Sequence, residues 1–255
     1  MNKILVMGSG SWGTALVKIL LESANMHVDW WVRSPDMAEY INTKGRNPKY
    51  LRSVKLDTNR LKASSDVQEL VAANDTILLV TPSAFVSDIL DQLTNEQLIG
   101  KKIISAIKGV EPKSLKIVGE YLIEHKGVNE SDFGVITGPC HAEEVAQEKL
   151  SYLTFASTST VFCEKMCAAL DCGYIKVTPS ADIYGTEISA VLKNVYAIAA
   201  GMCHSLGYGD NFQAVLVSNA IREIKRFIAA VHPIDRDADD SAYLGDLLVT
   251  AYSQY

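Results

Sequence analysis

The chain has 255 residues, of which 48% are hydrophobic and 21% are charged, and it carries a net charge of −6 at pH 7. A chain of this size buries a full core, so we expect one large domain and part of a second. The negative net charge excludes a general attraction to nucleic acid or to anionic lipid. An anionic ligand therefore has to be bound by a local cluster of cations.

No apolar run approaches the roughly 18 residues that a membrane span needs, and the first residues are too few for a signal-peptide core. We expect a soluble, cytoplasmic protein with no membrane insertion and no nucleic-acid partner. The five cysteines contain no C-x-x-C pair, and their odd number favours reduced thiols. Cys163, Cys167 and Cys172 could be a metal set, but no histidine lies near them in sequence. We interpret them as small buried hydrophobic side chains and predict no metal site.

The first thirteen residues carry the most informative motif. An apolar run over residues 4–7 meets a glycine-rich turn, and apolar residues at helical spacing follow it. In such a turn Gly8 permits the sharp bend, Gly10 lets a pyrophosphate approach the backbone, and Gly13 lets the helix pack close to the sheet. The helix N-terminus offers unpaired N–H groups to the phosphates. We predict a dinucleotide-binding strand–turn–helix, and the alternative is a packing turn that merely uses glycines.

Strand and helix patterns alternate over the first half of the chain. Strands are expected at residues 28–32, 76–80, 102–107 and 134–137, and helices at 36–43 and 114–124. This alternation predicts an α/β protein with a doubly wound parallel sheet of Rossmann type. Strands at residues 152–156 and 174–177 are expected to extend the sheet.

The pattern changes after residues 178–180. Residues 188–202 and 217–231 follow helical spacing with no strand between them. We therefore place a boundary near Pro179, with a dinucleotide-binding domain over residues 1–179 and an all-helical second domain over residues 180–255.

Residues 45–62 are polar, irregular and rich in Lys and Arg. We interpret this stretch as a solvated loop, with Tyr50 as the exception. The alternative is a flap beside the cofactor.

The end of the second expected strand bears on the choice of dinucleotide. NAD-specific folds place an Asp or Glu there to hold the ribose 2′-hydroxyl, whereas this chain has Arg33. A guanidinium can pair with a 2′-phosphate, so Arg33 favours NADP or at least its acceptance. Asp29 lies too early in the strand to be the ribose ligand. The alternative is that Arg33 merely faces solvent.

Short motifs follow three expected strands, at the edge where parallel sheets bind ligands: residues 81–85, Lys108-Gly109 and residues 137–141. Lys108 places a cation at this edge. A second lysine, Lys193, lies beside Asn194 inside an apolar helical pattern. It either snorkels to the surface or sits in a cleft, where desolvation or a neighbouring cation lowers its pKa toward the range useful for proton transfer.

These motifs together resemble the NAD(P)-dependent glycerol-3-phosphate dehydrogenase family. The resemblance extends from Met1 to Tyr255 and rests on an ordered set of segments: residues 8–16 (GSGSWGTAL), Lys108-Gly109, Gly138-Pro139, residues 191–194 (VLKN), Gly201-Met202 and residues 244–247 (LGDL). The resemblance implies the reversible reduction of dihydroxyacetone phosphate to sn-glycerol 3-phosphate, for glycerophospholipid synthesis. It also implies a phosphorylated triose as substrate and a homodimer.

The same resemblance implies roles for individual residues. Lys193 matches the catalytic lysine, Asp246 matches an aspartate that orients it and holds a substrate hydroxyl, and Lys108 contacts cofactor and substrate. Further cofactor-binding residues are Gly8, Gly10, Ser11, Trp12, Gly13, Arg33, Phe85 and Ala142. Further substrate-binding residues are Gly138, Cys140, Asn194 and Thr250.

Two departures from the family pattern affect the substrate site. The family usually has Ser or Thr at the position of Cys140. We therefore expect the backbone of Cys140, and not its thiol, to contact the substrate. A thiol is a weak hydrogen-bond donor and is an unsuitable nucleophile here. Family members also continue with an Asn/Arg-rich segment whose arginine binds the substrate phosphate, whereas this sequence stops at Tyr255. The helical domain is therefore expected to be incomplete, either shortened or continued outside the sequence given. A chain without that arginine is expected to bind cofactor but turn over poorly.

Two alternatives stay open from the sequence. The first is a related dehydrogenase that acts on another hydroxy acid or sugar acid, which activity on a non-phosphorylated carbonyl acid would favour. The second is a non-catalytic NAD(P)-binding regulator, which NADPH binding without turnover would favour.

Overall fold

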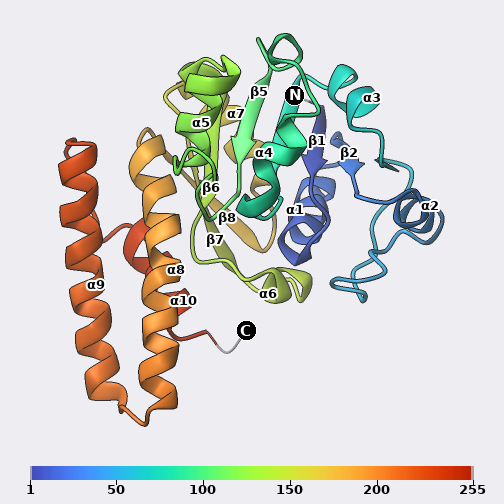
Figure 1. The fold of residues 1–255 in the computed structure, drawn as a ribbon. Helices are drawn as coiled ribbons and strands as arrows, with labels where there is room; N and C mark the ends of the chain where they lie inside the picture. Colours follow the sequence, from blue (N-terminus) through green and yellow to red (C-terminus); the bar gives the residue numbers. More distant parts are fainter. Residues whose placement is uncertain (1, 254–255) are drawn as a thin grey trace.

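The computed structural model describes residues 2–253, within which eight strands form one sheet in the order β3-β2-β1-β4-β5-β6-β7-β8 (Figure 1). The strands are β1 (Lys3–Met7), β2 (His27–Trp31), β3 (Leu61–Ser64), β4 (Thr76–Leu79), β5 (Lys102–Ser105), β6 (Phe133–Thr137), β7 (Ser151–Ala156) and β8 (Ile175–Ser180). Every neighbouring pair is parallel except β6 and β7, where a short connection through α6 (Ala142–Ala146) reverses the chain. The predicted Rossmann-type α/β sheet is confirmed.

Both faces of the sheet are buried, as its apolar strands require. Ile4 and Val6 of β1 belong to one core cluster, and Leu5 and Met7 belong to the other, because successive side chains in a strand point to opposite faces. The first cluster includes α1 (Ser11–Glu22), α2 (Pro35–Lys44) and α7 (Thr160–Leu170). The second includes α3 (Val67–Ala72), α4 (Val86–Leu90) and α5 (Val118–Lys126). The glycine turn between β1 and α1 is thereby held at the middle of the sheet.

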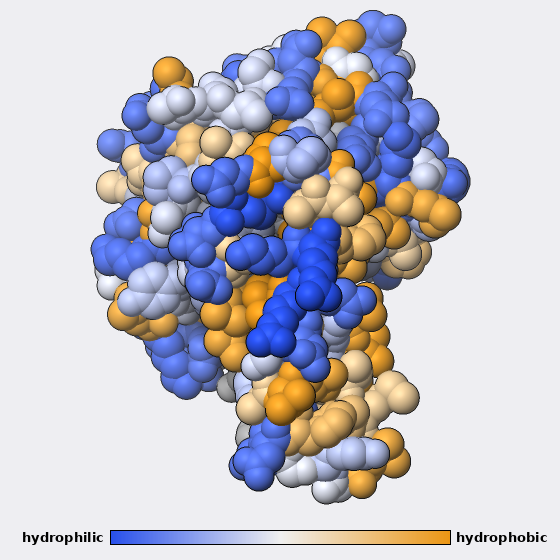
Figure 2. Space-filling view, turned by 90° about the vertical axis from the view of Figure 1, so that its left-hand side faces the viewer, coloured by the Kyte–Doolittle hydropathy of each residue, from blue (hydrophilic) through white to orange (hydrophobic). Residues whose placement is uncertain are grey.

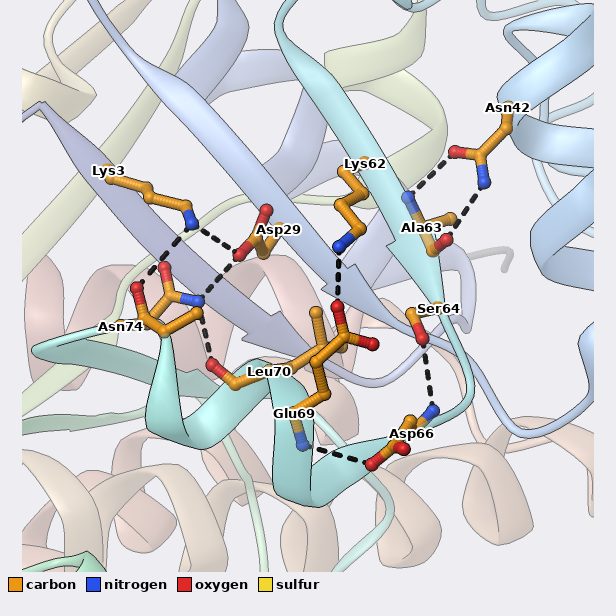
Figure 3. Close-up of polar contacts among 11 residues, drawn as sticks. Lys3, Asp29, Asn42, Lys62, Ala63, Ser64, Asp66, Glu69, Leu70 and Asn74 are labelled. Atoms are coloured by element: carbon orange, nitrogen blue, oxygen red, sulfur yellow. Dashed lines mark hydrogen bonds and ion pairs between the residues drawn. The ribbon is translucent and has the colours of Figure 1, made fainter.

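One local expectation was wrong, and one strand was missed. The helix expected at residues 114–124 begins only at Val118, because residues 111–117 form a tight turn around the buried carboxylate of Glu111. That carboxylate accepts hydrogen bonds from the backbone N–H groups of Lys113 and Ser114, and Leu115 has a φ of +59°, which no helical residue adopts. The short edge strand β3 was not expected at all. The Asn42 side chain pairs with both backbone groups of Ala63 at 2.8 Å and so ties β3 to α2 (Figure 3).

The chain after β8 is helical. It comprises α8 (Ile183–Ser205), α9 (Asp210–Val231), a π-helical turn at Ser241–Gly245 and α10 (Asp246–Ala251). These elements share a third core cluster that includes Ile188, Ile224 and Leu247. In Figure 1, α8 and α9 lie side by side as a hairpin that extends past the sheet.

No helix within residues 2–253 is long and apolar enough to cross a bilayer. The same residues contain no group of three or more His, Cys, Asp or Glu side chains placed to hold a metal ion. Cys163 is buried in the first core cluster, and Cys167 and Cys172 pack against that cluster.

Candidate active site

The turn between β1 and α1 has the geometry that phosphate binding requires. Gly8 has a φ of +130°, and a Cβ atom there would lie 2.7 Å from the carbonyl oxygen of Val80. At Gly10, by contrast, a Cβ atom would meet nothing within 4 Å, so the space beside this backbone is open. The first N–H groups of α1 have no partner inside the helix, so they can donate hydrogen bonds to an anion at this turn. The turn therefore fits a dinucleotide pyrophosphate.

A buried asparagine outside the motif supports this turn. Asn47 is 1% exposed, and its Nδ2 donates to the carbonyl oxygen of Ser9 at 2.9 Å and to Oγ1 of Thr14 at 2.8 Å. Its Oδ1 accepts hydrogen bonds from the backbone N–H groups of Lys49 and Tyr50. The side chain thus fixes the glycine turn with all of its strong hydrogen-bonding groups in use.

This contact corrects the interpretation of residues 45–62 as a solvated loop. Asn47, Val54 and Leu56 are buried, whereas Tyr50, the expected exception, is 44% exposed. The alternation of Val54 and Leu56 is the only sequence signal that could have indicated burial. Nothing in the sequence pointed to Asn47, because an asparagine in a basic stretch is typical of an exposed turn.

The second strand carries a buried aspartate and is followed by an exposed arginine, whose exposure agrees both with a 2′-phosphate ligand and with a solvent-facing side chain. Arg33 is exposed just past the end of β2, at the carboxyl edge of the sheet. Asp29 is engaged elsewhere: it lies 2.8 Å from Nζ of Lys3 and accepts a hydrogen bond of 2.7 Å from Nδ2 of Asn74 (Figure 3). Asp29 is thus a structural carboxylate and is not presented to a ribose.

Three charged side chains from three separate elements meet at the carboxyl edge of the sheet. Lys193 of α8 and Asp246 at the start of α10 form an ion pair in which their side chains are 3% and 1% exposed. Nζ of Lys108, which follows β5, lies 3.8 Å from Oδ1 of Asp246. Thr137, at the end of β6, donates to Oδ2 of Asp246 at 3.2 Å. The two lysines identified from the sequence therefore converge on one carboxylate.

Burial and repulsion make Lys193 a titratable group near neutral pH. Desolvation and the Lys108 ammonium lower the pKa of Lys193 from 10.5 to about 7, although the Asp246 carboxylate opposes the shift. A lysine with such a pKa can both give and take a proton near neutrality. The snorkelling alternative is wrong, because the Lys193 side chain does not reach the surface.

The remaining expected substrate residues surround this pair. Nδ2 of Asn194 donates to the carbonyl oxygen of Lys108 at 3.0 Å, and Oγ1 of Thr250 donates to the carbonyl oxygen of Asp246 at 2.6 Å. Both residues line a cavity of about 410 Å³, together with His141. Nε2 of His141 lies 3.4 Å from the carbonyl oxygen of Val249, so its ring joins the start of α6 to α10. His141 ends the motif of residues 137–141 that the sequence places at this edge, but it was given no role there, because only the fold brings it opposite α8 and α10.

Gly138 and Cys140 lie in the connection between β6 and α6. Gly138 has a φ of +121°, and a Cβ atom there would lie 2.8 Å from the carbonyl oxygen of Tyr152, so glycine is required. Burial raises the pKa of the Cys140 thiol to about 12, which keeps it protonated. This thiol is no nucleophile, in agreement with the discounting of its side chain.

Two of the expected cofactor residues, Trp12 and Lys108, lie near each other. Nζ of Lys108 lies 5.9 Å from the centre of the Trp12 ring, which brings the second lysine motif next to the start of α1. Phe85 ends a short turn whose Ser83 lies against Gly109, and Ala142 is buried as the first residue of α6. Phe85 itself is 49% exposed, so its ring is available to a ligand.

A glycine turn of the dinucleotide-binding type, with a buried and titratable lysine at the carboxyl edge of the same sheet, is typical of the dinucleotide-dependent dehydrogenases. Comparisons with known proteins then specify the family. The model of the NAD-dependent glycerol-3-phosphate dehydrogenase N-terminus matches residues 3–163, and the model of the C-terminus matches residues 182–255. The chain belongs to the NAD-dependent glycerol-3-phosphate dehydrogenase family.

Individual relatives agree with this result. Glycerol-3-phosphate dehydrogenase [NAD(P)+] of Azotobacter vinelandii is 36% identical over 250 residues, which cover 98% of this chain and 72% of the relative. The glycerol-3-phosphate dehydrogenase structure from Coxiella burnetii has a TM-score of 0.89 and 27% identity, and the match covers 99% of this chain and 76% of that one. DsGPDH of Dunaliella salina has a TM-score of 0.91 and 26% identity, and this chain spans 46% of its length. The hydroxy-acid, sugar-acid and regulator alternatives are not favoured by these relatives.

Proposed function

We propose that this chain reduces dihydroxyacetone phosphate to sn-glycerol 3-phosphate, reversibly, with NADPH or NADH. The observation that carries this proposal is the buried ion pair of Lys193 and Asp246, which the partly exposed Lys108 approaches from the side of Trp12. Membership of the family indicates the substrate. The geometry brings together the proton donor and the charged groups that a carbonyl reduction needs.

The dinucleotide, when bound, supplies the hydride. The residues proposed to hold it are Gly8, Gly10, Ser11, Trp12, Gly13, Arg33, Phe85, Lys108 and Ala142. The open space at Gly10 and the nearness of Lys108 to Trp12 support this assignment. The exposed guanidinium of Arg33 at the end of β2 supports a preference for NADP.

In the proposed reaction the Lys193 ammonium gives a proton to the carbonyl oxygen as negative charge develops on it. The oxygen becomes the new hydroxyl, and Lys193 is left as a neutral amine that then takes a proton from solvent. In the reverse direction this amine removes the hydroxyl proton. The Asp246 carboxylate orients the ammonium and accepts a hydrogen bond from a substrate hydroxyl, while Lys108 adds positive charge near the developing oxyanion.

The substrate phosphate is proposed to extend into the cavity lined by Asn194, Thr250 and His141. This cavity adjoins the Lys193–Asp246 pair, since Asn194 follows Lys193 on α8 and Thr250 lies one turn after Asp246 on α10. The backbone N–H groups around Gly138 and Cys140 add further donors. The helical part of the chain is accordingly proposed to be the substrate domain, with its boundary near Pro179.

The cellular setting is part of the same proposal: a cytoplasmic homodimer that feeds glycerophospholipid synthesis. The hairpin of α8 and α9 exposes apolar side chains on the part of Figure 2 that extends past the sheet. Ile198, Met202, Leu206 and Val215 are between 57% and 74% exposed. A gathering of exposed apolar residues on one face supports association.

The activity is tested by following NADPH oxidation in the presence of dihydroxyacetone phosphate. Non-phosphorylated dihydroxyacetone serves as the matched substrate, because it presents the same carbonyl without the phosphate. Turnover of the phosphorylated substrate at a much higher kcat/KM is the expected result. Turnover of a non-phosphorylated hydroxy acid alone, or no turnover with any carbonyl, would contradict the proposal.

A further inference from the structure

A second buried charge cluster, centred on Asp182, lies outside the residues that contact the cofactor or the substrate. Asp182 precedes α8 and is 8% exposed. Its Oδ2 accepts hydrogen bonds from Nε of Arg236 at 2.7 Å and from the hydroxyl of Tyr243 at 2.6 Å. Its Oδ1 accepts a hydrogen bond from the backbone N–H of Gly185 at 2.9 Å, in the first turn of α8.

This cluster joins the two chain segments that carry the buried ion pair of the active site. Asp182 caps α8, the helix that carries Lys193. Tyr243 lies in the π-helical turn Ser241–Gly245, directly before Asp246. A π-helical turn is rare and is frequently found at functional sites. The 4% exposed Tyr243 is therefore well placed to fix how Asp246 enters α10.

Arg236 strengthens the same connection. Its Nη2 donates to the carbonyl oxygen of His232 at 3.0 Å and reaches Oδ1 of Asp182 at 3.4 Å. The Asp182 carboxylate is thus bound by Arg236, in the middle of the connection between α9 and the π-helical turn, and by Tyr243, in that turn itself. A buried carboxylate with this many donors holds a fixed position, because leaving any of them unpaired is costly.

We infer that Asp182, Arg236 and Tyr243 are positioning residues that hold the Asp246 carboxylate against the Lys193 ammonium. The inference rests on the proposed function for its catalytic consequence, but its structural content concerns only the Lys193–Asp246 pair. The charged groups that face Lys193 are Asp246 of α10 and Lys108 after β5. When Asp246 moves away, Lys108 remains, so Lys193 loses its stabilising partner and keeps its repulsive one.

The test removes the Tyr243 hydroxyl with Tyr243→Phe, which keeps the ring packing. Tyr208→Phe at the tip of the α8–α9 hairpin is the matched control, because Tyr208 is 52% exposed and remote from the cluster. The first readout is an NMR pH titration of the Lys193 ε-methylene group, assigned with Lys193→Arg. We expect the pKa of Lys193 to fall by roughly one unit in Tyr243→Phe and to stay unchanged in Tyr208→Phe.

The second readout is steady-state kinetics on the same variants. We expect kcat for dihydroxyacetone phosphate reduction at neutral pH to fall about tenfold in Tyr243→Phe, with an unchanged Kd for NADPH. Arg236→Lys, which keeps the charge but not the forked contact, should shift both readouts in the same direction. Lower thermal stability with an unchanged Lys193 pKa and an unchanged kcat would overturn the inference. A wild-type protein that does not turn over the triose phosphate would refute the proposed function, and the NMR titration would still decide the inference.

Discussion

Lys193 and Asp246 lie 53 residues apart in the sequence and form a buried ion pair between α8 and α10. Such a pair stabilises little by itself, but removing one partner leaves an uncompensated buried charge at a cost of about 3–5 kcal/mol. The pair therefore fits the proposed role of Lys193 as a proton donor that Asp246 holds in place. The Lys108 ammonium lowers the pKa of Lys193, and the ion pair with Asp246 fixes the orientation of the Lys193 side chain.

The two directions of the reaction should depend on pH in opposite ways. Burial and Lys108 lower the pKa of Lys193 to about 7, and carbonyl reduction needs the ammonium form. We expect kcat/KM for dihydroxyacetone phosphate to be constant at low pH and to fall as the pH rises through about 7. Oxidation of sn-glycerol 3-phosphate needs the neutral amine, so kcat/KM for sn-glycerol 3-phosphate should rise over the same interval. Parallel profiles in the two directions would exclude Lys193 as the group that moves the proton.

Arg33 should determine the preference between the two dinucleotides. In Arg33→Ala, the Kd for NADH divided by the Kd for NADPH should fall about tenfold or more, because a charged hydrogen bond to the 2′-phosphate is lost. Arg222→Ala, a change at another exposed arginine, on α9, is the control. A selectivity that is the same in both variants would assign the preference to other residues.

Asn47 should matter for dinucleotide binding although it lies outside the glycine motif. Asn47→Ala leaves the carbonyl oxygen of Ser9 without its donor and frees the turn, so the Kd for NADPH should rise several-fold. Asn42→Ala is a matched control, because Asn42 also makes two side-chain bonds to the backbone, at Ala63 of β3. Both changes should lower stability by about 1–3 kcal/mol, and only Asn47→Ala should weaken binding. Equal weakening in the two variants would contradict a local role for Asn47.

The sequence predicted the sheet and the lysines for clear physical reasons. Apolar strands alternating with helical patterns leave few arrangements other than a doubly wound sheet, and that sheet brings Lys108 and the glycine turn to one edge. The family resemblance added Asp246, which has no local signature of its own. Because all of these residues lie in short motifs, their roles could be stated before their contacts were known.

The missed features depend on contacts between distant segments. Asn47, His141 and the Asp182 cluster each join elements that periodicity treats separately, so no window of sequence reveals them. The misplaced start of α5 has a local cause: the Glu111 carboxylate holds the N–H groups of Lys113 and Ser114 in a turn, and Leu115 adopts a φ of +59°, which interrupts a right-handed helix. Neither feature is visible in apolar spacing.

Glu187 should make the stability of the protein depend on pH. Burial raises the pKa of this α8 carboxyl from 4.5 to about 8, although a hydrogen bond of 3.0 Å from the backbone N–H of Gly119 opposes the shift. Between these two values the unfolded chain binds fewer protons than the folded one, so stability should fall as the pH rises from about 5 toward 8.

Glu187→Gln keeps a hydrogen-bond acceptor and removes this titration. Its thermal unfolding midpoint should therefore vary less over the same pH interval than that of the wild type. The exposed Glu164→Gln on α7 should behave like the wild type. A midpoint that declines equally in all three proteins would show that Glu187 is not the source.

The central claim is that Lys193 supplies the proton, and it is tested most directly by the single-turnover rate of NADPH oxidation in Lys193→Ala. With saturating dihydroxyacetone phosphate, we expect this rate to fall by about 10²–10⁴-fold, the usual contribution of a general acid, while the Kd for NADPH stays unchanged. The exposed Lys225→Ala on α9 should keep the wild-type rate. A Lys193→Ala rate within a few-fold of wild type would contradict the account.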